Sequence, residues 1–221
     1  MSRGIFVTGT DTGVGKTVVS AALMIRLRSL GRVCYWKPIQ TGIEQDDDTA
    51  EVASLAACTA DELLTDGVRL PRPLSPHLSA RLSDMTIELD PLVEISKRVP
   101  ASTHLVVEGA GGALVPINDR DMMTDLMARL ALPVIIAARS GLGTINHTLL
   151  TLEALRRQRL TVAAVVMVGP PNADNRAAIE QFGGVPVAGE MPMFAPMNAE
   201  QLSAWSVREL DPDHRLLETL R

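Results

Sequence analysis

Short apolar runs recur along the chain, and each is followed by a stretch that suits a helix. The runs that predict strands cover residues 5–8, 33–36, 104–107, 133–137 and 162–168, with a weaker one at 186–188. Apolar residues recur at helical spacing between them, for example in 18–27, 122–130 and 144–157. Nearly continuous apolar runs are typical of strands buried on both faces of a parallel sheet. The alternation therefore predicts an α/β fold, with a doubly wound, mostly parallel sheet between two layers of helices.

No repeat, low-complexity tract or linker divides the chain, so we expect one domain over residues 1–221. The proline-rich segment 70–77 is interpreted as a loop inside this domain, because the segments on both sides of it belong to the shared sheet. Ligands of open parallel sheets bind at the carboxyl ends of the strands. Four loops are therefore candidates for the site, namely those after Thr8, Trp36, Val107 and Ala138.

Composition narrows the possible partners of the protein. Of the 221 residues, 46% are hydrophobic and 21% are charged, which is ordinary for a globular protein. The net charge of −5, from 21 basic and 26 acidic residues, argues against nucleic acid as the main partner. Cys34 and Cys58 lack the spacing of metal ligands and are interpreted as reduced cysteines. With no signal-peptide pattern and no apolar run of membrane-spanning length, we expect a cytoplasmic protein with no membrane partner.

The segment 9–17, with the sequence GTDTGVGKT, predicts a binding site for the phosphates of a nucleoside triphosphate. It lies between a predicted strand and a predicted helix, so several backbone N–H groups would surround one anion. Lys16 would add a positive charge near the β- and γ-phosphates, and the Thr17 hydroxyl would bind Mg²⁺. The usual pattern has a glycine where this chain has Thr10, and Gly9 lies one residue further away. The alternative is a glycine-rich turn of an ordinary α/β domain, which we regard as the weaker interpretation.

A second lysine follows the next predicted strand. Lys37 opens the segment 37–42 (KPIQTG) directly after an apolar run, at the rim of the predicted site. Such a lysine can simply lay its stem over the core and keep its charge in water. Because the phosphate loop is predicted nearby, a cation that faces an anionic substrate or a transferring phosphoryl group is the better interpretation.

Two acidic segments are candidates for binding Mg²⁺. Asp46, Asp47 and Asp48 follow one another, and such a triplet can be a solvated loop, a helix N-cap or the source of one metal ligand. The residues alone leave open which of the three would bind. Glu108 closes a predicted strand before the glycine-rich segment 109–112, which favours a metal ligand over a simple loop glutamate.

A second glycine-rich turn lies at 140–143 and leads into a predicted helix. A helix N-terminus of this kind can bind an anion such as a carboxylate, and an ordinary loop with a capping residue fits equally well. His77 and His147 could be catalytic bases, but single histidines are more often packed or capping residues, so neither is given a role.

Taken together and in this order, these segments resemble the dethiobiotin synthetase family. The resemblance extends to about Phe194, and it accounts for the shifted glycine, because the phosphate loop of this family has the same longer spacing. It implies a P-loop NTPase fold and a single ATP-dependent ligase domain. It also implies an enzyme of biotin synthesis that joins CO₂ to 7,8-diaminopelargonate and releases ADP and phosphate. The partners implied are ATP, CO₂, the diamine and a second copy of the chain, with active sites at the interface of the homodimer.

The roles of individual residues follow from the same resemblance. It implies that the catalytic residues are Thr12, Lys16 and Lys37. The nucleotide and its Mg²⁺ would be bound by Gly13, Val14, Gly15, Lys16, Thr17, Asp48, Glu108, Gly109, Ala110, Gly111, Pro192, Met193 and Phe194. Among these, Thr17, Asp48 and Glu108 would bind the Mg²⁺ cofactor. The diamine would contact Thr41 of its own subunit and Gly143, Thr144, Ile145 and Asn146 of the neighbouring subunit.

Two positions depart from the family pattern. Some members have an acidic residue in the phosphate loop where this chain has Gly13, so that side chain plays no role here. Some also have an Asn-Asp pair after the strand that corresponds to 162–168, and the asparagine reads adenine. This chain has Gly169-Pro170-Pro171 there, which implies an ATP site with weaker discrimination of the base.

Three other kinds of protein share parts of this pattern. Partitioning-type ATPases have a lysine five residues before the P-loop lysine, where this chain has Asp11. Amidating ligases that act on a cobalamin precursor need a glutamine-hydrolysing domain, for which this chain has no room. A GTP-binding module would need an Asn-Lys-x-Asp segment, and the sequence has none.

Overall fold

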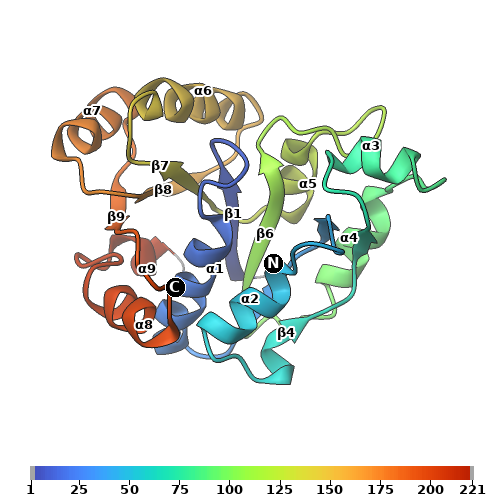
Figure 1. The fold of residues 1–221 in the computed structure, drawn as a ribbon, viewed down its shortest axis with the longest axis horizontal. Coiled ribbons are helices and arrows are strands. Elements are labelled where there is room, and N and C mark those ends of the chain that lie inside the picture. Colours follow the sequence, from blue (N-terminus) through green and yellow to red (C-terminus); the bar gives the residue numbers. More distant parts are fainter. Residues whose placement is uncertain (1–2, 220–221) are drawn as a thin grey trace.

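The computed structural model describes residues 3–219, and within them seven parallel strands form the central sheet (Figure 1). Their spatial order is β4-β2-β6-β1-β7-β8-β9, so the strand that precedes the phosphate loop lies in the middle. The strands are β1 (Arg3–Gly9), β2 (Val33–Trp36), β4 (Leu63–Leu64), β6 (His104–Gly112), β7 (Val134–Arg139), β8 (Val162–Val168) and β9 (Val187–Met191). This confirms the predicted parallel α/β fold.

Helices cover both faces of this sheet and make three layers. One face packs against α3 (Pro76–Arg81), α4 (Leu89–Ser96), α5 (Met123–Leu130), α6 (Thr144–Arg157) and α7 (Ala173–Gly183). The other face packs against α1 (Lys16–Leu27), α2 (Asp48–Leu55), α8 (Ala199–Arg208) and α9 (Arg215–Thr219). Figure 1 shows α6 and α7 on the opposite side of the sheet from α1 and α8. Short 3₁₀ turns lie at Arg28–Leu30 and Ala60–Glu62.

Alternation along the strands decides which side chains can reach the α1 face. In β2, Cys34 and Trp36 belong to the core under α3 to α7, whereas Tyr35 belongs to the core under α1. Tyr35 pairs with Val106 of β6, and Glu108 lies two residues further along that strand. Because successive side chains of a strand point to opposite faces, Tyr35, Val106 and Glu108 share the α1 face.

The structure adds a second, two-stranded parallel sheet that the sequence pattern did not predict. It pairs β3 (Ile39–Thr41) with β5 (Val68–Leu70), so Thr41 lies in a strand and not in a simple loop. Strands of three residues are too short for an alternating pattern to be recognised. The small sheet packs beside β6 and keeps the segment after Lys37 next to the large sheet.

Several boundaries predicted from the sequence were wrong, including those of the loop 70–77 and the end of the strand that contains Glu108. Within the predicted loop 70–77, Leu70 ends β5 and Pro76 begins α3, so His77 lies in a helix. Proline is favoured in the first turn of a helix because its missing N–H would have no partner there. Glu108 was expected to close its strand, but β6 continues to Gly112.

Residues 1–2 and 220–221 of the expected domain lie outside the described part of the chain. Between Arg3 and Thr219, no helix combines the length and the apolar character needed to cross a membrane.

Candidate functional site

The phosphate loop connects β1 to α1 and ends with glycine in a left-handed conformation. Gly15 has φ 93° and serves as the N-cap of α1 without a side-chain hydrogen bond to the helix. A Cβ at this position would lie 3.1 Å from the Val168 side chain of β8, so only glycine fits without a shift. The first N–H groups of α1 therefore have no side-chain cap, and this end of the helix can bind an anion.

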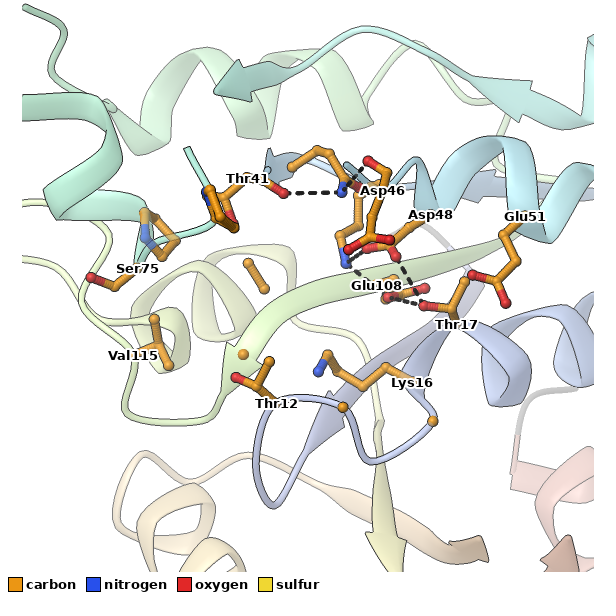
Figure 2. A pocket seen from close by; sticks show the side chains of 18 of the residues that line it. Thr12, Lys16, Thr17, Thr41, Asp46, Asp48, Glu51, Ser75, Glu108 and Val115 are labelled. Carbon is orange, nitrogen blue, oxygen red and sulfur yellow. Dashed lines mark hydrogen bonds and ion pairs between the residues drawn. The ribbon is translucent and has the colours of Figure 1, made fainter. Parts of the chain in front are cut away.

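Thr17 of α1 lies between two carboxylates that come from distant parts of the chain (Figure 2). Its hydroxyl oxygen is 3.1 Å from Asp48 Oδ1 at the start of α2 and 3.1 Å from Glu108 Oε1 of β6. A hydroxyl has a single proton, so it donates to one of these carboxylates at a time. Three side chains with oxygen atoms, those of Thr17, Asp48 and Glu108, thus meet at the N-terminus of α1.

The structure separates the three neighbouring aspartates. Asp47 caps α2, because its carboxylate accepts a hydrogen bond from the backbone N–H of Ala50 at 3.0 Å. Asp48 is the first residue of the helix and lies beside Thr17. Asp46 lines the cavity that these residues border. The choice that the residues alone left open thus falls on Asp48 as the aspartate next to Thr17 and Glu108.

These oxygen donors fit Mg²⁺. Within residues 3–219 there is no cluster of three or more Asp, Glu, His or Cys side chains suited to a metal. Mg²⁺ does not need one, because in nucleotide sites it takes one or two carboxylates from the protein and completes its shell with phosphate oxygens and water. Two carboxylates and one hydroxyl next to a phosphate loop match this requirement.

Lys37, directly after β2, contacts both carboxylates. Its Nζ lies 2.5 Å from Asp48 Oδ2 and 2.7 Å from Glu108 Oε1, and it also donates to the backbone oxygen of Gly109 at 3.2 Å. The residue was expected at the rim, but it is only 3% exposed. Burial alone would lower the pKa of Lys37, yet the charges of Glu108 and Asp48 outweigh burial and raise it above its ordinary value. The ammonium group therefore keeps its proton.

Lys16 supplies a second ammonium group on the loop side of the cavity (Figure 2). Its Nζ lies 3.4 Å from the backbone oxygen of Asp11 in its own loop. Burial, and then the charge of Lys37, lower the pKa of Lys16. An anion bound between the two lysines would relieve this repulsion, and the site therefore favours a highly charged phosphate.

Most of the predicted site residues line one cavity of about 740 Å³. Those that the sequence predicted are Thr12, Gly13, Gly15, Lys16, Thr17, Lys37, Thr41, Asp48, Glu108, Ala110 and Gly111. Val14 is buried beneath the loop, and Gly109 contributes its backbone oxygen to Lys37. The cavity extends past the phosphate loop toward Pro73, Leu74 and Val115, which give it an apolar end. It can hold a polyphosphate and a second, partly aliphatic molecule side by side.

Two predicted groups do not line this cavity. Pro192, Met193 and Phe194 follow β9, which lies on the other side of β1 from β2 in the sheet. Gly143, Thr144, Ile145 and Asn146 form the N-terminus of α6 after β7. Their assigned contacts stay predictions.

The structure explains why position 169 is a glycine, which the sequence alone did not. Its φ is 135°, and a Cβ there would lie 2.4 Å from the Ser140 hydroxyl. A side chain at this position would displace Ser140, so an asparagine cannot simply be placed there in this chain.

Several site residues were missed by sequence reasoning. The Tyr35 hydroxyl donates to Glu108 Oε2 at 2.9 Å, and Arg139 at the end of β7 binds both the Asp11 carboxylate and the Thr12 backbone oxygen. Burial, and then the charges of Glu108 and Asp48, raise the pKa of Tyr35 well above its usual value, so the phenol keeps its proton. Tyr35 and Lys37 are two residues apart, a spacing that could have indicated that their side chains point to the same side of the extended segment.

Comparisons with known proteins give consistent results. Residues 3–201 match the AAA domain family. The chain is 51% identical over 201 residues to the ATP-dependent dethiobiotin synthetase BioD of Paramagnetospirillum magneticum, covering 91% of this chain and 93% of the relative. The protein of the same name from Brucella melitensis biotype 2 is 45% identical, covering 91% of this chain and 92% of that protein. The chain also matches the biotin biosynthesis bifunctional protein BioCD of Bordetella avium, at 49% identity over 92% of this chain but only 42% of that protein.

Solved structures share the fold at low sequence identity. A ParA family ATPase from Chlorobium tepidum has a TM-score of 0.57 and 10% identity, covering 93% of this chain and 98% of that one. The signal recognition particle receptor FtsY from Elizabethkingia anophelis has a TM-score of 0.54 and 14% identity, covering 93% of this chain and 65% of that one. At these identities the likeness describes the fold alone.

Proposed function

The chain belongs to the dethiobiotin synthetase family, and on this premise we propose that it uses ATP to join CO₂ to 7,8-diaminopelargonate. The products are dethiobiotin, ADP and phosphate. The observation that carries the proposal is the meeting of Lys16, Lys37, Asp48 and Glu108 at one cavity beside the phosphate loop. We further propose that residues 1–221 form a single ligase domain and that the enzyme is cytoplasmic.

The nucleotide would bind with its phosphates over the N-terminus of α1. Support comes from the uncapped N–H groups after Gly15 and from the buried ammonium group of Lys16. Thr12 lines the same cavity and would contact the phosphates as well. The base would lie on the β8 and β9 side, near Pro192, Met193 and Phe194. With glycine at 169, we propose an ATP site that discriminates weakly among bases.

Thr17, Asp48 and Glu108 would hold Mg²⁺. The Thr17 hydroxyl lies 3.1 Å from one oxygen of each carboxylate, and hard oxygen donors suit this ion. When bound, Mg²⁺ supplies positive charge beside the phosphates of the nucleotide.

The residues position reactants and neutralise charge, and no protein nucleophile is needed. One amine of the diamine adds to CO₂, loses a proton and becomes a carbamate. A carbamate oxygen attacks the γ-phosphorus, and ADP leaves. The second amine then attacks the carbamoyl carbon, phosphate leaves with the C–O bonding electrons, and the ring closes with loss of a proton. Lys37 would donate hydrogen bonds to the carbamate and to the oxygens that pass between it and the γ-phosphate.

To donate hydrogen bonds to the substrate, Lys37 must release the carboxylates of Asp48 and Glu108. In the structure its three donor contacts go to Asp48, Glu108 and the Gly109 backbone. A cation held by Asp48 and Glu108 would compensate their charge and leave the ammonium group for the substrate. Binding of the metal and activation of Lys37 are therefore coupled.

The diamine would lie between Thr41 and the apolar end of the cavity, with its carboxylate at the 143–146 turn of a second copy. In its own chain this turn does not line the cavity. Leu142, the residue before Gly143, and Leu150 on α6 are largely exposed, which favours an interface there. We therefore propose a homodimer in which each turn completes the partner's site.

Mixing two inactive variants tests this arrangement. Lys37→Ala and Asn146→Ala protomers should each be nearly inactive as homodimers. A mixture reassociated from equal amounts should regain roughly a quarter of the wild-type activity, because half of the dimers are mixed and each of these has one intact site. Phosphate release at 25 °C measures the recovery, and no recovery in verified mixed dimers would contradict the shared site.

The proposed reaction has a direct assay. Purified protein with Mg²⁺, ATP and bicarbonate should release phosphate only when 7,8-diaminopelargonate is added, and dethiobiotin should accumulate in equal amount. An analogue with one amine offers a matched control, since it can form a carbamate but cannot close the ring. A rate of phosphate release that does not depend on the diamine would instead indicate a switch ATPase.

A further inference from the structure

Tyr35 is the single tyrosine of the chain, and it lies completely buried under the candidate site. It extends from β2 into the core that packs against α1. Its hydroxyl donates to Glu108 Oε2 at 2.9 Å. Tyr35 does not line the cavity, so its contact with the site runs through Glu108.

The two oxygens of Glu108 have separate partners. Oε1 accepts from Lys37 Nζ at 2.7 Å and lies 3.1 Å from the Thr17 hydroxyl, both on the cavity side. Oε2 has Tyr35 as its partner on the core side. A carboxylate can rotate about its last bond, and the barrier between its orientations is low. Tyr35 therefore selects the orientation in which one oxygen points to the site and the other to the core.

The register of the sheet accounts for this pairing. Tyr35 lies opposite Val106, and Glu108 is two residues further along β6 on the same face. Two residues of a strand correspond to about 6.6 Å. A phenol ring with its hydroxyl is long enough to bridge this rise, and a phenylalanine would leave Oε2 without a donor. Since Glu108 is 0% exposed, water cannot easily replace that donor.

We propose that Tyr35 is a positioning residue, which holds Glu108 in the orientation that binds Mg²⁺ together with Asp48 and Thr17. The inference rests on the proposed function, in which Glu108 holds the ion. Tyr35 itself touches neither the substrate nor the ion.

The test replaces Tyr35 by phenylalanine and measures the dependence on Mg²⁺. In Tyr35→Phe, the Mg²⁺ concentration for half-maximal phosphate release should rise roughly tenfold, as expected for an outer partner of a metal ligand. Calorimetric titration of Mg²⁺ into the enzyme with ADP should show the same weakening without turnover. Ser206→Ala removes another buried hydroxyl, which donates to the Leu202 backbone oxygen in α8, and it should leave both values unchanged.

A double-mutant cycle shows whether Tyr35 acts through Glu108. Glu108→Gln should weaken Mg²⁺ binding more than Tyr35→Phe does, and the double variant should be no worse than Glu108→Gln alone. If the factors by which the two substitutions weaken Mg²⁺ binding multiply in the double variant, the inference is overturned. A Tyr35→Phe enzyme with the wild-type Mg²⁺ dependence would also overturn it. If instead the wild-type enzyme needs no Mg²⁺, the proposed metal site itself fails.

A spectroscopic measurement keeps the test independent of the stability of the variant. Because Tyr35 is the single tyrosine, growth with 3-fluorotyrosine gives one fluorine resonance. Adding Mg²⁺ to the ADP complex should shift this resonance, and the shift should be lost in Glu108→Gln. A resonance that does not respond to Mg²⁺ would overturn the inference.

Discussion

Replacing Lys37 by alanine is expected to lower turnover by roughly a thousandfold, with little change in nucleotide affinity. Lys37 follows β2, outside the phosphate loop, and contacts Asp48 and Glu108, so we expect its charge to act on the transferring group and not on the bound nucleotide. Single-turnover phosphate release measures the first quantity, and calorimetric titration with ADP measures the second. The exposed Lys97 is the remaining lysine of the chain besides Lys16, and Lys97→Ala should behave like the wild type.

The same substitution has a consequence for stability. Without Lys37, the carboxylates of Asp48 and Glu108 face each other across Thr17 with no ammonium group between them. Burial raises the pKa of Asp48, and Lys37 is the main charge that brings it below its ordinary value, so this pKa should rise in the variant. Mg²⁺ should therefore raise the Tm of Lys37→Ala more than that of the wild type.

For the turnover prediction, the contradicting result would be a loss of ADP affinity in Lys37→Ala as large as its loss of turnover. That result would assign Lys37 to nucleotide binding instead.

Replacing Lys16 by alanine should give a different pattern, in which ATP affinity and turnover fall together. Loss of a charged hydrogen bond to phosphate corresponds to a roughly ten- to hundredfold weaker affinity. Titration with ADP and the concentration dependence of phosphate release measure this change. A normal ADP affinity in Lys16→Ala would contradict the proposed binding of phosphates over α1.

The pH dependence connects the two lysines. Lys16 binds phosphate as an ammonium group, so nucleotide affinity should fall as the pH rises through its pKa. Burial, and then Lys37, lower this pKa in the wild type. In Lys37→Ala the second cause is absent, so the fall in ADP affinity should move to higher pH. An unchanged profile would mean that the two ammonium groups do not interact.

The sequence predicted the features that are local along the chain. Two strands, 33–36 and 162–168, and the helix 144–157 have the predicted bounds, because their apolar periodicity is complete within one element. The phosphate loop was recognisable for the same reason, since its glycines, lysine and threonine are contiguous. The strands β3, β4 and β5 were missed because two or three residues show no period.

The cluster around Thr17 illustrates what local patterns leave open. Asp48 and Glu108 are 31 and 91 residues away from Thr17 in the sequence, and Glu108 is 71 residues away from Lys37. The family resemblance assigned these residues to one site, but it gave neither the burial of Lys37 nor its ion pairs with the two carboxylates. Tyr35 was not expected at all, because a tyrosine in an apolar strand has the same pattern as any core residue.

By itself, the sequence determined the parallel α/β fold, the phosphate loop and the residue types available for phosphoryl transfer, because each depends on neighbours along the chain. Only the tertiary structure decided which of the three aspartates faces Thr17, where Lys37 places its charge and which side chain orients Glu108. The physical reason is that sheet order and register bring β2, β6 and the N-termini of α1 and α2 together, and no single segment contains that information.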